Sequence, residues 1–396
     1  MPGGDGRRLP EALPRPAPIP IATTWRWATP QAQQVLATRD LGAILRFHRS
    51  VNSLSQTALG DLLGYDKTYV SLLENHRRTI PDMDSRRRIA TGLGLPPHVL
   101  GVTDPADADH HAMLQFGEST VRLGEIARQS GHASEAVAEL WPLVARLEAR
   151  IEHGHAEREV LRLLARARVG LGVALGNVLP EERLGTAARW TARSLEITRH
   201  FEDPGFTSYV LRMHGNELRK ARLCGAAVNR LQHAVALAPD RDARAAALPL
   251  LARAAGAIRN GTLFDQVMRE NDALLEDATP TSLFNAFALH EIRLRGLIAT
   301  GRPQEAIRLA DDSPVPTTRV APQWRVIELV TVGHVRLLAD DRTGASEALS
   351  SAIAEAVAQR LPHQLQRIIR TAHSAMPGTR DLAAQALDRL RQEMAA

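Results

Sequence analysis

Apolar residues along this chain recur at three- and four-residue intervals, and no segment after residue 110 alternates apolar and polar positions as a strand does. Beyond residue 110 the spacing predicts longer amphipathic helices that continue to the end of the sequence. The pattern therefore predicts an all-α protein in two parts. In the first part it predicts short helices near residues 30–37, 39–50, 55–63, 66–76, 82–93 and 96–100.

The longer helices are predicted to pair around short turns, and the clearest pair occupies residues 208–239. In this pair Gly215 falls in the first helix, small or apolar residues recur in the second, and Pro239 ends the unit. These spacings resemble the tetratricopeptide repeat, so we expect a tetratricopeptide-like α-solenoid of about five or six helix pairs over residues 110–396. Glycines recur at the expected turns, roughly 40 residues apart where adjacent, and they are Gly131, Gly225, Gly261, Gly301 and Gly344.

Two segments lack an apolar helical face. Residues 1–24 hold repeated prolines and are predicted to be a disordered arm. Trp25 and Trp27 end this arm, and we expect them to pack over the first helix that follows rather than to bind a partner. Residues 105–109 are predicted to be a linker between a domain at 25–104 and the repeats.

Residues 54–81 have the spacing of a helix-turn-helix. Ser55 can cap a helix that begins at Gln56, and Gly60 within it would let another helix approach closely. Gly64 suits a sharp turn, because such a turn requires a residue that tolerates positive φ. A second helix from about Asp66 would then be presented outward, as in proteins that read the major groove.

This stretch resembles the helix-turn-helix of phage-type repressors, the xenobiotic-response-element family of regulators, and the likeness extends over residues 36–102. His76 departs from it, because the family usually has glycine there, and the loop before Pro81 is one residue longer. Followed by helical repeats, this order implies a transcriptional regulator. The matching residues are Leu54, Ser55, Gln56, Gly60, Leu63, Gly64, Val70, Ser71, Glu74, Arg77, Arg78 and Pro81.

In this fold the first turn of the second helix meets base edges, while helix ends and flanking loops contact phosphates. We therefore expect Lys67, Thr68 and Ser71 to face the major groove, with Lys67 donating to guanine. The alternatives are an ordinary solvated Lys67 and a Tyr69 packed within the domain. We expect Glu74 to pair with a nearby arginine. The remaining DNA-contact candidates are Gln56, Thr57, Tyr69, Asn75, Arg77 and Arg78.

Composition narrows these expectations. The formal net charge is only +5, so DNA binding must rest on local placement of charge rather than on the total. The single cysteine, Cys224, excludes an internal disulfide and a cysteine-rich zinc site, which agrees with a reducing cytoplasm. No run of about 20 apolar residues is present, so we expect a cytoplasmic protein without a membrane span.

The sequence offers no catalytic constellation. His290 and Glu291 begin like a zinc-protease helix, but Leu294 occupies the position of the second histidine. No phosphate-binding glycine loop is present either. We therefore expect no enzyme, no metal and no cofactor.

The repeats also carry a candidate ligand surface. Arg212, Asn216 and Arg219 fall at i, i+4 and i+7 on one helix, and this polar stripe could hold a peptide backbone or a carboxylate. The alternative is a simple solvated inner face. Neighbouring helices could add Arg253, Asn260, Asn285 and Arg293.

Together these features favour a sequence-specific regulator that binds double-stranded DNA. A single helix-turn-helix covers few base pairs, so we expect a homodimer, formed mainly through the repeats, on a palindromic operator. The repeats would tune DNA affinity by sensing a peptide or a small molecule. The alternative is a protein–protein interaction scaffold that the N-terminal domain tethers to DNA.

Overall fold

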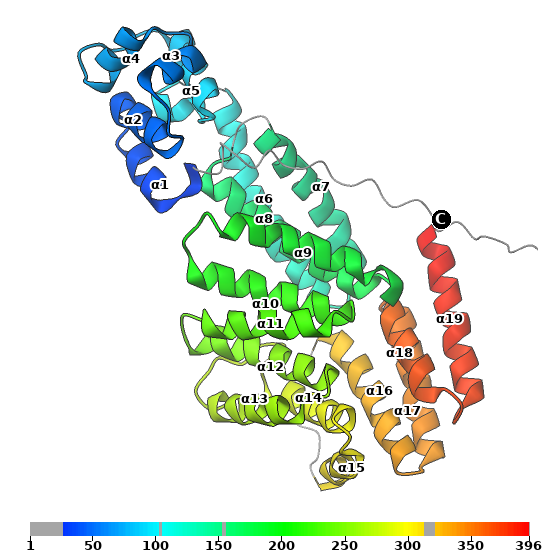
Figure 1. The fold of residues 1–396 in the computed structure, drawn as a ribbon. Helices are drawn as coiled ribbons and strands as arrows, with labels where there is room; N and C mark the ends of the chain where they lie inside the picture. Colours follow the sequence, from blue (N-terminus) through cyan, green and yellow to red (C-terminus); the bar gives the residue numbers. More distant parts are fainter. Residues whose placement is uncertain (1–26, 103–104, 153–155, 313–320, 396) are drawn as a thin grey trace, which may run out of the picture.

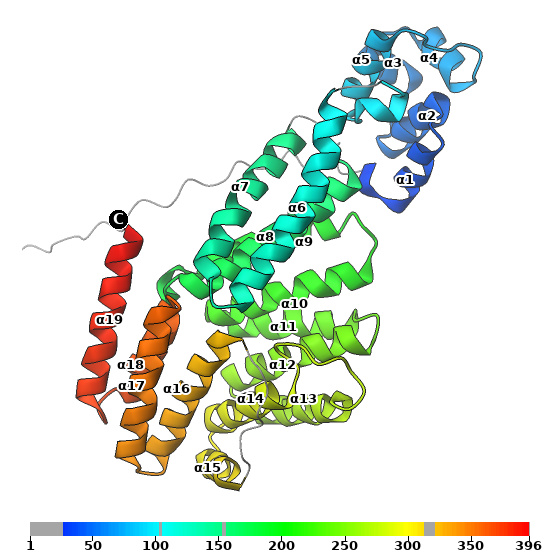
Figure 2. The ribbon, with the colours of Figure 1, turned by 180° about the vertical axis from the view of Figure 1, so that it is seen from behind.

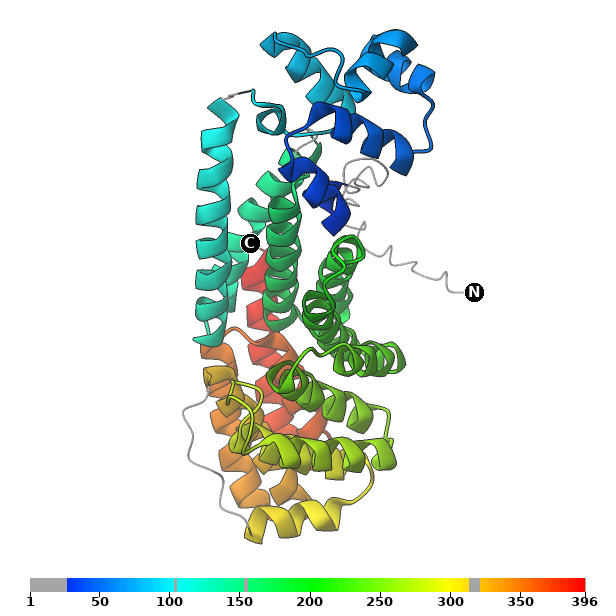
Figure 3. The same ribbon diagram turned by 90° about the vertical axis from the view of Figure 1, so that its left-hand side faces the viewer.

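The computed structural model describes residues 27–102, 105–152, 156–312 and 321–395 (Figure 1). Within these ranges every regular element is a helix, which confirms the all-α prediction. A bundle of short helices lies at one end of a curved solenoid, and α15 lies at the opposite end (Figures 1 and 3). No helix in the described ranges has the length and apolar content needed to cross a bilayer. The predicted arm at residues 1–24, and Trp25, lie outside the described residues.

The N-terminal bundle begins and ends its helices close to the predicted positions. Side chains of Thr29, Asp40, Ser55, Asp66 and Asp82 each accept a hydrogen bond from a backbone N–H in the first turn of the helix that follows. These caps explain why the chain enters its helices at these points. The elements are α1 (Pro30–Ala37), α2 (Leu41–Val51), α3 (Gln56–Leu63), α4 (Lys67–Glu74), α5 (Met83–Leu93) and the 3₁₀ helix η2 (Pro97–Leu100).

Trp27 packs into the core of this bundle, as expected. Its indole Nε1–H donates to the carbonyl oxygen of Leu93 at 2.7 Å, and its ring centroid lies 5.5 Å from that of Phe47. The same core buries apolar residues from α2 to α5, including Leu59 and Val70. Because both helices of the helix-turn-helix contribute to one core, their mutual angle is fixed by packing.

The remaining helices pair in antiparallel fashion along the chain (Figures 1 and 2). They are α6 (Pro105–Gln129), α7 (Ala133–Glu152), α8 (Arg158–Val178), α9 (Leu184–Thr198), α10 (Pro204–Lys220), α11 (Cys224–Ala236), α12 (Arg241–Ala257), α13 (Gly261–Leu274), α14 (Ala286–Ala299), α15 (Pro303–Asp312), α16 (Pro322–Leu338), α17 (Arg342–Ala358), α18 (Pro362–Ala372) and α19 (Pro377–Ala395), with a 3₁₀ turn, η3 (Glu181–Arg183), before α9. The described residues thus form seven pairs rather than five or six. Residues 105–109, predicted as a linker, belong to α6.

Glycine spacing undercounted the pairs because the connections between α8 and α9 and between α18 and α19 contain no glycine. Arg222, Arg259 and Asp340 have φ values of 63°, 57° and 60° at the turns within three of the pairs. The glycines predicted for those turns fall instead within the first turn of α11, α13 and α17. In these three pairs the glycine marks the right pair, but a polar residue two to four positions earlier makes the turn.

Close contact within a pair does depend on glycine. A Cβ atom on Gly215 of α10 would lie 2.6 Å from Cγ of Leu231 on α11, which is too close for any real side chain. Gly333 of α16 faces Leu349 of α17 in the same way, at 2.7 Å. The repeat-like spacing of these residues in the sequence thus corresponds to a real helix–helix contact.

The solenoid curves until its last pair meets its second pair. The guanidinium of Arg370 on α18 donates to both carboxylate oxygens of Glu181 in η3, each at 2.7 Å. Gln366 accepts from the backbone N–H of Glu181, and Arg391 of α19 donates to Glu182 at 2.6 Å. We call this contact between α18–α19 and η3 the closure contact.

The bundle is joined to the solenoid through the first residue of α8. The guanidinium of Arg158 donates to the carbonyl oxygen of Ala28 and, at 2.7 Å, to that of Phe201. Ala28 itself is buried against apolar residues of α7 and α8. The two parts of the chain therefore share a packed boundary.

Candidate functional site

The helix-turn-helix depends on close approach at Gly60. A Cβ atom there would lie 2.3 Å from the carbonyl oxygen of Tyr65, a backbone atom that cannot move aside cheaply. Gly64 ends α3 with φ 76°, as the sequence predicted. Asp66 then begins α4 by accepting from the backbone N–H of Tyr69 at 2.8 Å. Gly60, Gly64 and Asp66 together determine how α4 packs against α3.

Glu74, at the end of α4, is the centre of a buried hydrogen-bond network. Arg49 Nε donates to its Oε1 at 2.9 Å, and Gln56 Nε2 donates to its Oε2 at 2.7 Å. Arg46 donates to the backbone carbonyl oxygen of the same residue. Burial would raise the pKa of Glu74, but the bonds from Arg49 and Gln56 overcome it and lower the pKa. The predicted pairing of Glu74 with an arginine is confirmed.

The N-terminal turn of α4 is open to solvent. Lys67 and Thr68 are exposed, while Tyr69 and Ser71 are half-buried. The tyrosine ring stacks on Tyr65 at 4.7 Å, so the packing alternative for this residue is realised. Exposure of Lys67 and Thr68 is required for contact with DNA, and it fits the alternative of an ordinary solvated Lys67 equally well.

The other DNA-contact candidates surround this turn. Thr57, Asn75, Arg77 and Arg78 are exposed, and the guanidinium of Arg78 lies 4.8 Å from the Tyr69 ring centroid. Gln56 is half-buried with its amide directed to Glu74, which gives it a bracing role. The residues gather around one helix, and their contacts with DNA stay predictions.

His76 occupies the position where the related pattern has glycine. It adopts φ 62°, the left-handed conformation that glycine favours, and the N–H of Arg77 bonds to the carbonyl oxygen of Leu72 at 2.9 Å. The helix end that the family makes with glycine is therefore made here with histidine. The departure changes the residue and leaves the left-handed helix end in place.

A second candidate site is a cavity of about 500 Å³ at the centre of the solenoid. The first helix of every pair contributes to its lining, from Arg128 on α6 to Arg367 on α18. Apolar lining comes from residues such as Leu250 and Trp324. The size falls within the range of pockets for small organic ligands, about 300–1,000 Å³.

The structure brings only part of the predicted ligand surface to this cavity. Asn216, Arg219 and Arg253 line it. Four others lie elsewhere: Arg212 packs over the Tyr209 ring, Asn260 caps α13, Asn285 caps α14, and Arg293 pairs with Asp272 at 2.5 Å. Asn260 and Asn285 are explained by capping, a role that their place before a helix could have indicated.

Sequence reasoning missed several lining residues, notably Lys220, Arg295, His363 and Arg367. The prediction named Arg293, whereas Arg295, two positions later on the same helix, lines the cavity. Two residues correspond to a rotation of about 200° around the helix axis, so the two side chains lie on different faces. The two α18 residues had no signal, because only the closure contact places that helix beside α8 and α10.

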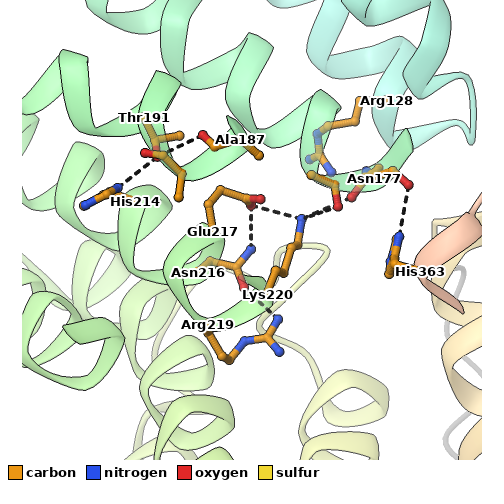
Figure 4. A network of polar contacts seen from close by, with 12 residues as sticks. Arg128, Asn177, Ala187, Thr191, His214, Asn216, Glu217, Arg219, Lys220 and His363 are labelled. Carbon is orange, nitrogen blue, oxygen red and sulfur yellow. Dashed lines mark hydrogen bonds and ion pairs between the residues drawn. The ribbon is translucent and has the colours of Figure 1, made fainter. Parts of the chain in front are cut away.

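A polar network borders the cavity (Figure 4). Glu217 is fully buried, and its Oε1 lies 3.0 Å from Nζ of Lys220. The same ammonium group donates to Oδ1 of Asn177 and to the carbonyl oxygen of Gly176, both at 3.2 Å. Lys220 thus joins α10 to the end of α8.

His363 sits at the meeting of α18 and α8 in its neutral form. Its Nδ1–H donates to the carbonyl oxygen of Asn177 at 3.0 Å, and its Nε2 lies 3.1 Å from the amide nitrogen of Gln364, which can donate to it. Burial, with Lys220, Arg219 and Arg367 nearby, lowers the pKa of His363 to about 3. Both ring nitrogens are satisfied without a second proton.

This histidine should make the fold acid-sensitive. The unfolded chain binds a proton at His363 below about pH 6.5, whereas the folded protein does not until about pH 3, so stability falls as the pH drops between these values. At pH 5 the loss due to this residue is roughly 2 kcal/mol. Urea unfolding at pH 7.5 and pH 5 should show a smaller pH-dependent loss in His363→Gln. Replacing the exposed His233 by Gln should leave the pH-dependent loss as in the parent protein, and equal losses in the parent and His363→Gln would contradict the assignment.

No protein-family model and no curated protein match this chain. Among solved structures it is similar to the crystal structure of Bacillus thuringiensis PlcR in complex with the peptide PapR7 and DNA, at 14% sequence identity and a TM-score of 0.35. The match covers 69% of this chain and 95% of the PlcR chain. Similarity at this level does not assign the chain to a family, so its likeness to phage-type repressors rests on the residues between 36 and 102.

Proposed function

We propose that this protein is a cytoplasmic transcriptional regulator that binds double-stranded DNA at specific sequences, and that it acts by binding rather than by catalysis. The observation that carries the proposal is the exposed first turn of α4, with Lys67 and Thr68 open to solvent. Behind that turn, the Glu74 network and the contact at Gly60 hold α4 in place, as base readout requires.

A dimer is part of the proposal, because a palindromic operator matches a protein with two-fold symmetry. Its support is one face of α6, where Phe116, Leu123 and Ile126 are exposed by 70%, 60% and 54%. These residues recur at helical intervals, so they form one apolar stripe on the helix that follows the bundle. We propose that a second copy of the chain packs against this stripe in the dimer. Light scattering of the purified protein measures the mass of the particle in solution and tests whether it is that of two chains.

Selection of operators from a random duplex pool tests the readout. Thr68→Ala should lose discrimination at one base-pair position, by about 1–3 kcal/mol, because its hydroxyl or methyl group no longer meets a base. Lys67→Gln should weaken the preference for guanine in the same way. Affinities for operators with single-base changes give both numbers.

Two controls accompany this experiment. Thr91→Ala on α5 removes a hydroxyl that donates within its own helix, and Arg308→Gln removes an exposed charge on α15, so both should bind the operator like the parent protein. Equal affinity for every sequence, with strong dependence on salt, would instead favour an interaction scaffold tethered to DNA. An unchanged operator preference in Thr68→Ala and Lys67→Gln would remove the basis of the proposal.

We also propose that the solenoid senses an effector through the central cavity. Its support is the convergence of the first helices of all pairs around one space. An effector would change DNA affinity only if it bound two arrangements of the protein with different affinities. Measuring operator affinity with and without cell extract tests whether any effector acts.

A further inference from the structure

Four arginines from four different helices meet in the cavity. They are Arg219 of α10, Arg253 of α12, Arg295 of α14 and Arg367 of α18, and we call them the cationic cluster. Each is half-buried. None of them lies within 4.0 Å of a carboxylate oxygen in the described part of the chain. Most other buried arginines here do have such a partner, as Arg168 has in Glu148 at 2.7 Å.

The cluster also leaves hydrogen-bond donors unused. Nε of Arg219, Nε of Arg253 and Nη1 of Arg367 are buried, and no acceptor among the described residues reaches them. Arg253 lies over the Trp324 ring at 5.9 Å from its centroid, a contact that satisfies no N–H group. Buried donors without partners are costly, because they lose their bonds to water and gain none in return, and proteins rarely keep them without a use.

The positive charges disfavour one another. Burial, followed by the charges of Arg219, Arg295 and Arg367, lowers the pKa of Arg253 well below its usual value. Burial and the charge of Arg295 lower the pKa of Arg219 to about 10. The folded protein thus holds four like charges in a recess where water screens them poorly.

The nearest acidic groups do not neutralise this charge. Glu217 is matched by Lys220, and Glu181 is matched by Arg370 in the closure contact. Glu291 is fully buried behind the cluster, and burial raises its pKa to about 7, so it carries only part of a negative charge at neutral pH. A net positive charge therefore remains in the cavity.

The shape of the site limits what could supply the missing negative charge. A space of about 500 Å³ matches the pockets that hold small organic molecules. A carboxylate has two oxygens and pairs with one guanidinium fork through both of them, so four arginines call for more than one acidic group. Arginine forks match the planar or tetrahedral oxygens of carboxylates and phosphates. The apolar lining residues Leu250, Trp324 and Ile327 can cover a carbon skeleton.

We propose that the cavity binds a small molecule with two or more acidic groups, carboxylates or phosphates, which pair with Arg219, Arg253, Arg295 and Arg367. This inference names the ligand class for the sensing part of the proposed function, and it rests on that function for its regulatory meaning. Because Arg367 belongs to α18 and the other three to α10, α12 and α14, the ligand would join the last pair of the solenoid to the inner helices of its third, fourth and fifth pairs. Binding would then stabilise the closed form of the solenoid.

The test uses the full chain without DNA and two probes, inorganic pyrophosphate and citrate. Each should raise the melting temperature and bind measurably by calorimetry, compared with sodium chloride at equal ionic strength. The probe that binds more tightly shows whether phosphate or carboxylate groups are preferred. Arg253→Gln should bind that probe at least tenfold more weakly, and without probe it should melt at the same or a higher temperature, since a repelling charge is gone.

Arg308→Gln is the matched control, because this exposed arginine makes no ion pair with a described residue and does not line the cavity. It should keep the parent affinity for the probe. If Arg253→Gln does not fold, which would itself contradict the expected stabilisation, Arg367→Gln provides the second measurement. No response of the parent protein to either probe beyond that to chloride would overturn the inference, as would an unchanged affinity in both variants. Operator binding is measured separately, so a failure here is distinct from a failure of DNA recognition.

Discussion

Replacing Glu74 by alanine is expected to lower the free energy of unfolding of the N-terminal bundle by about 3 kcal/mol. The carboxylate is 3% exposed and accepts from both Arg49 and Gln56, so its removal leaves two donors without their acceptor. A fully buried ion pair broken in this way costs about 3–5 kcal/mol. The Arg49 side chain is 31% exposed, and water can reach it, which places the expected loss at the lower end. Chemical unfolding followed by circular dichroism measures it.

Two further variants show whether the network is the cause. Glu74→Gln keeps one acceptor oxygen and should lose less stability than Glu74→Ala. Glu347→Ala on α17 removes an exposed carboxylate and should change stability by no more than about 0.5 kcal/mol. Operator affinity should fall with Glu74→Ala as well, because α4 loses its side-chain bonds to Arg49 of α2 and Gln56 of α3. A Glu74→Ala protein with parental stability would show that the network contributes little.

Gly60→Ala is expected to destabilise the same bundle by roughly 3 kcal/mol, although alanine is the better helix former. The added methyl group would sit 2.3 Å from the carbonyl oxygen of Tyr65, and relief requires the turn between α3 and α4 to move. The identical change at Gly225, within the first turn of α11, meets no described atom within 4 Å and should be neutral or slightly stabilising. The melting temperature should therefore fall in Gly60→Ala and stay the same or rise slightly in Gly225→Ala. A Gly60→Ala protein that melts like the parent would refute the close approach of α3 and the turn.

The sequence was most informative where structure depends on local chemistry. Ser55, Gly64 and Asp66 each carry a signal for a cap or a turn, so both bounds of α3 and the start of α4 could be predicted within one residue, whereas α4 ends two residues before the predicted position. The close packing at Gly215 could be predicted because one small residue and its partner recur at fixed spacing. These features depend on neighbours within a few turns of helix.

The cavity could be predicted only in part, since it depends on contacts far apart in the chain. Arg219 and Arg253 stand out as polar residues on the inner helices, but nothing near Arg367 shows that α18 returns to α8. That return follows from small rotations summed over the successive pairs, which no local pattern encodes. Asn260 and Asn285 were wrongly predicted to bind a ligand. Each caps the helix that follows it, and this local role is sufficient to explain an asparagine at these positions.

The position of α8 has a consequence for communication within the molecule. Its first residue, Arg158, binds the backbone of the N-terminal bundle, and the carbonyl of Asn177 near its last turn receives the bond from His363. A helix of 21 residues is about 30 Å long and stiff along its axis. One continuous helix therefore connects the lining of the cavity with the domain that carries α4. A displacement of one end of α8 would move the other end with it, because no loop interrupts the helix.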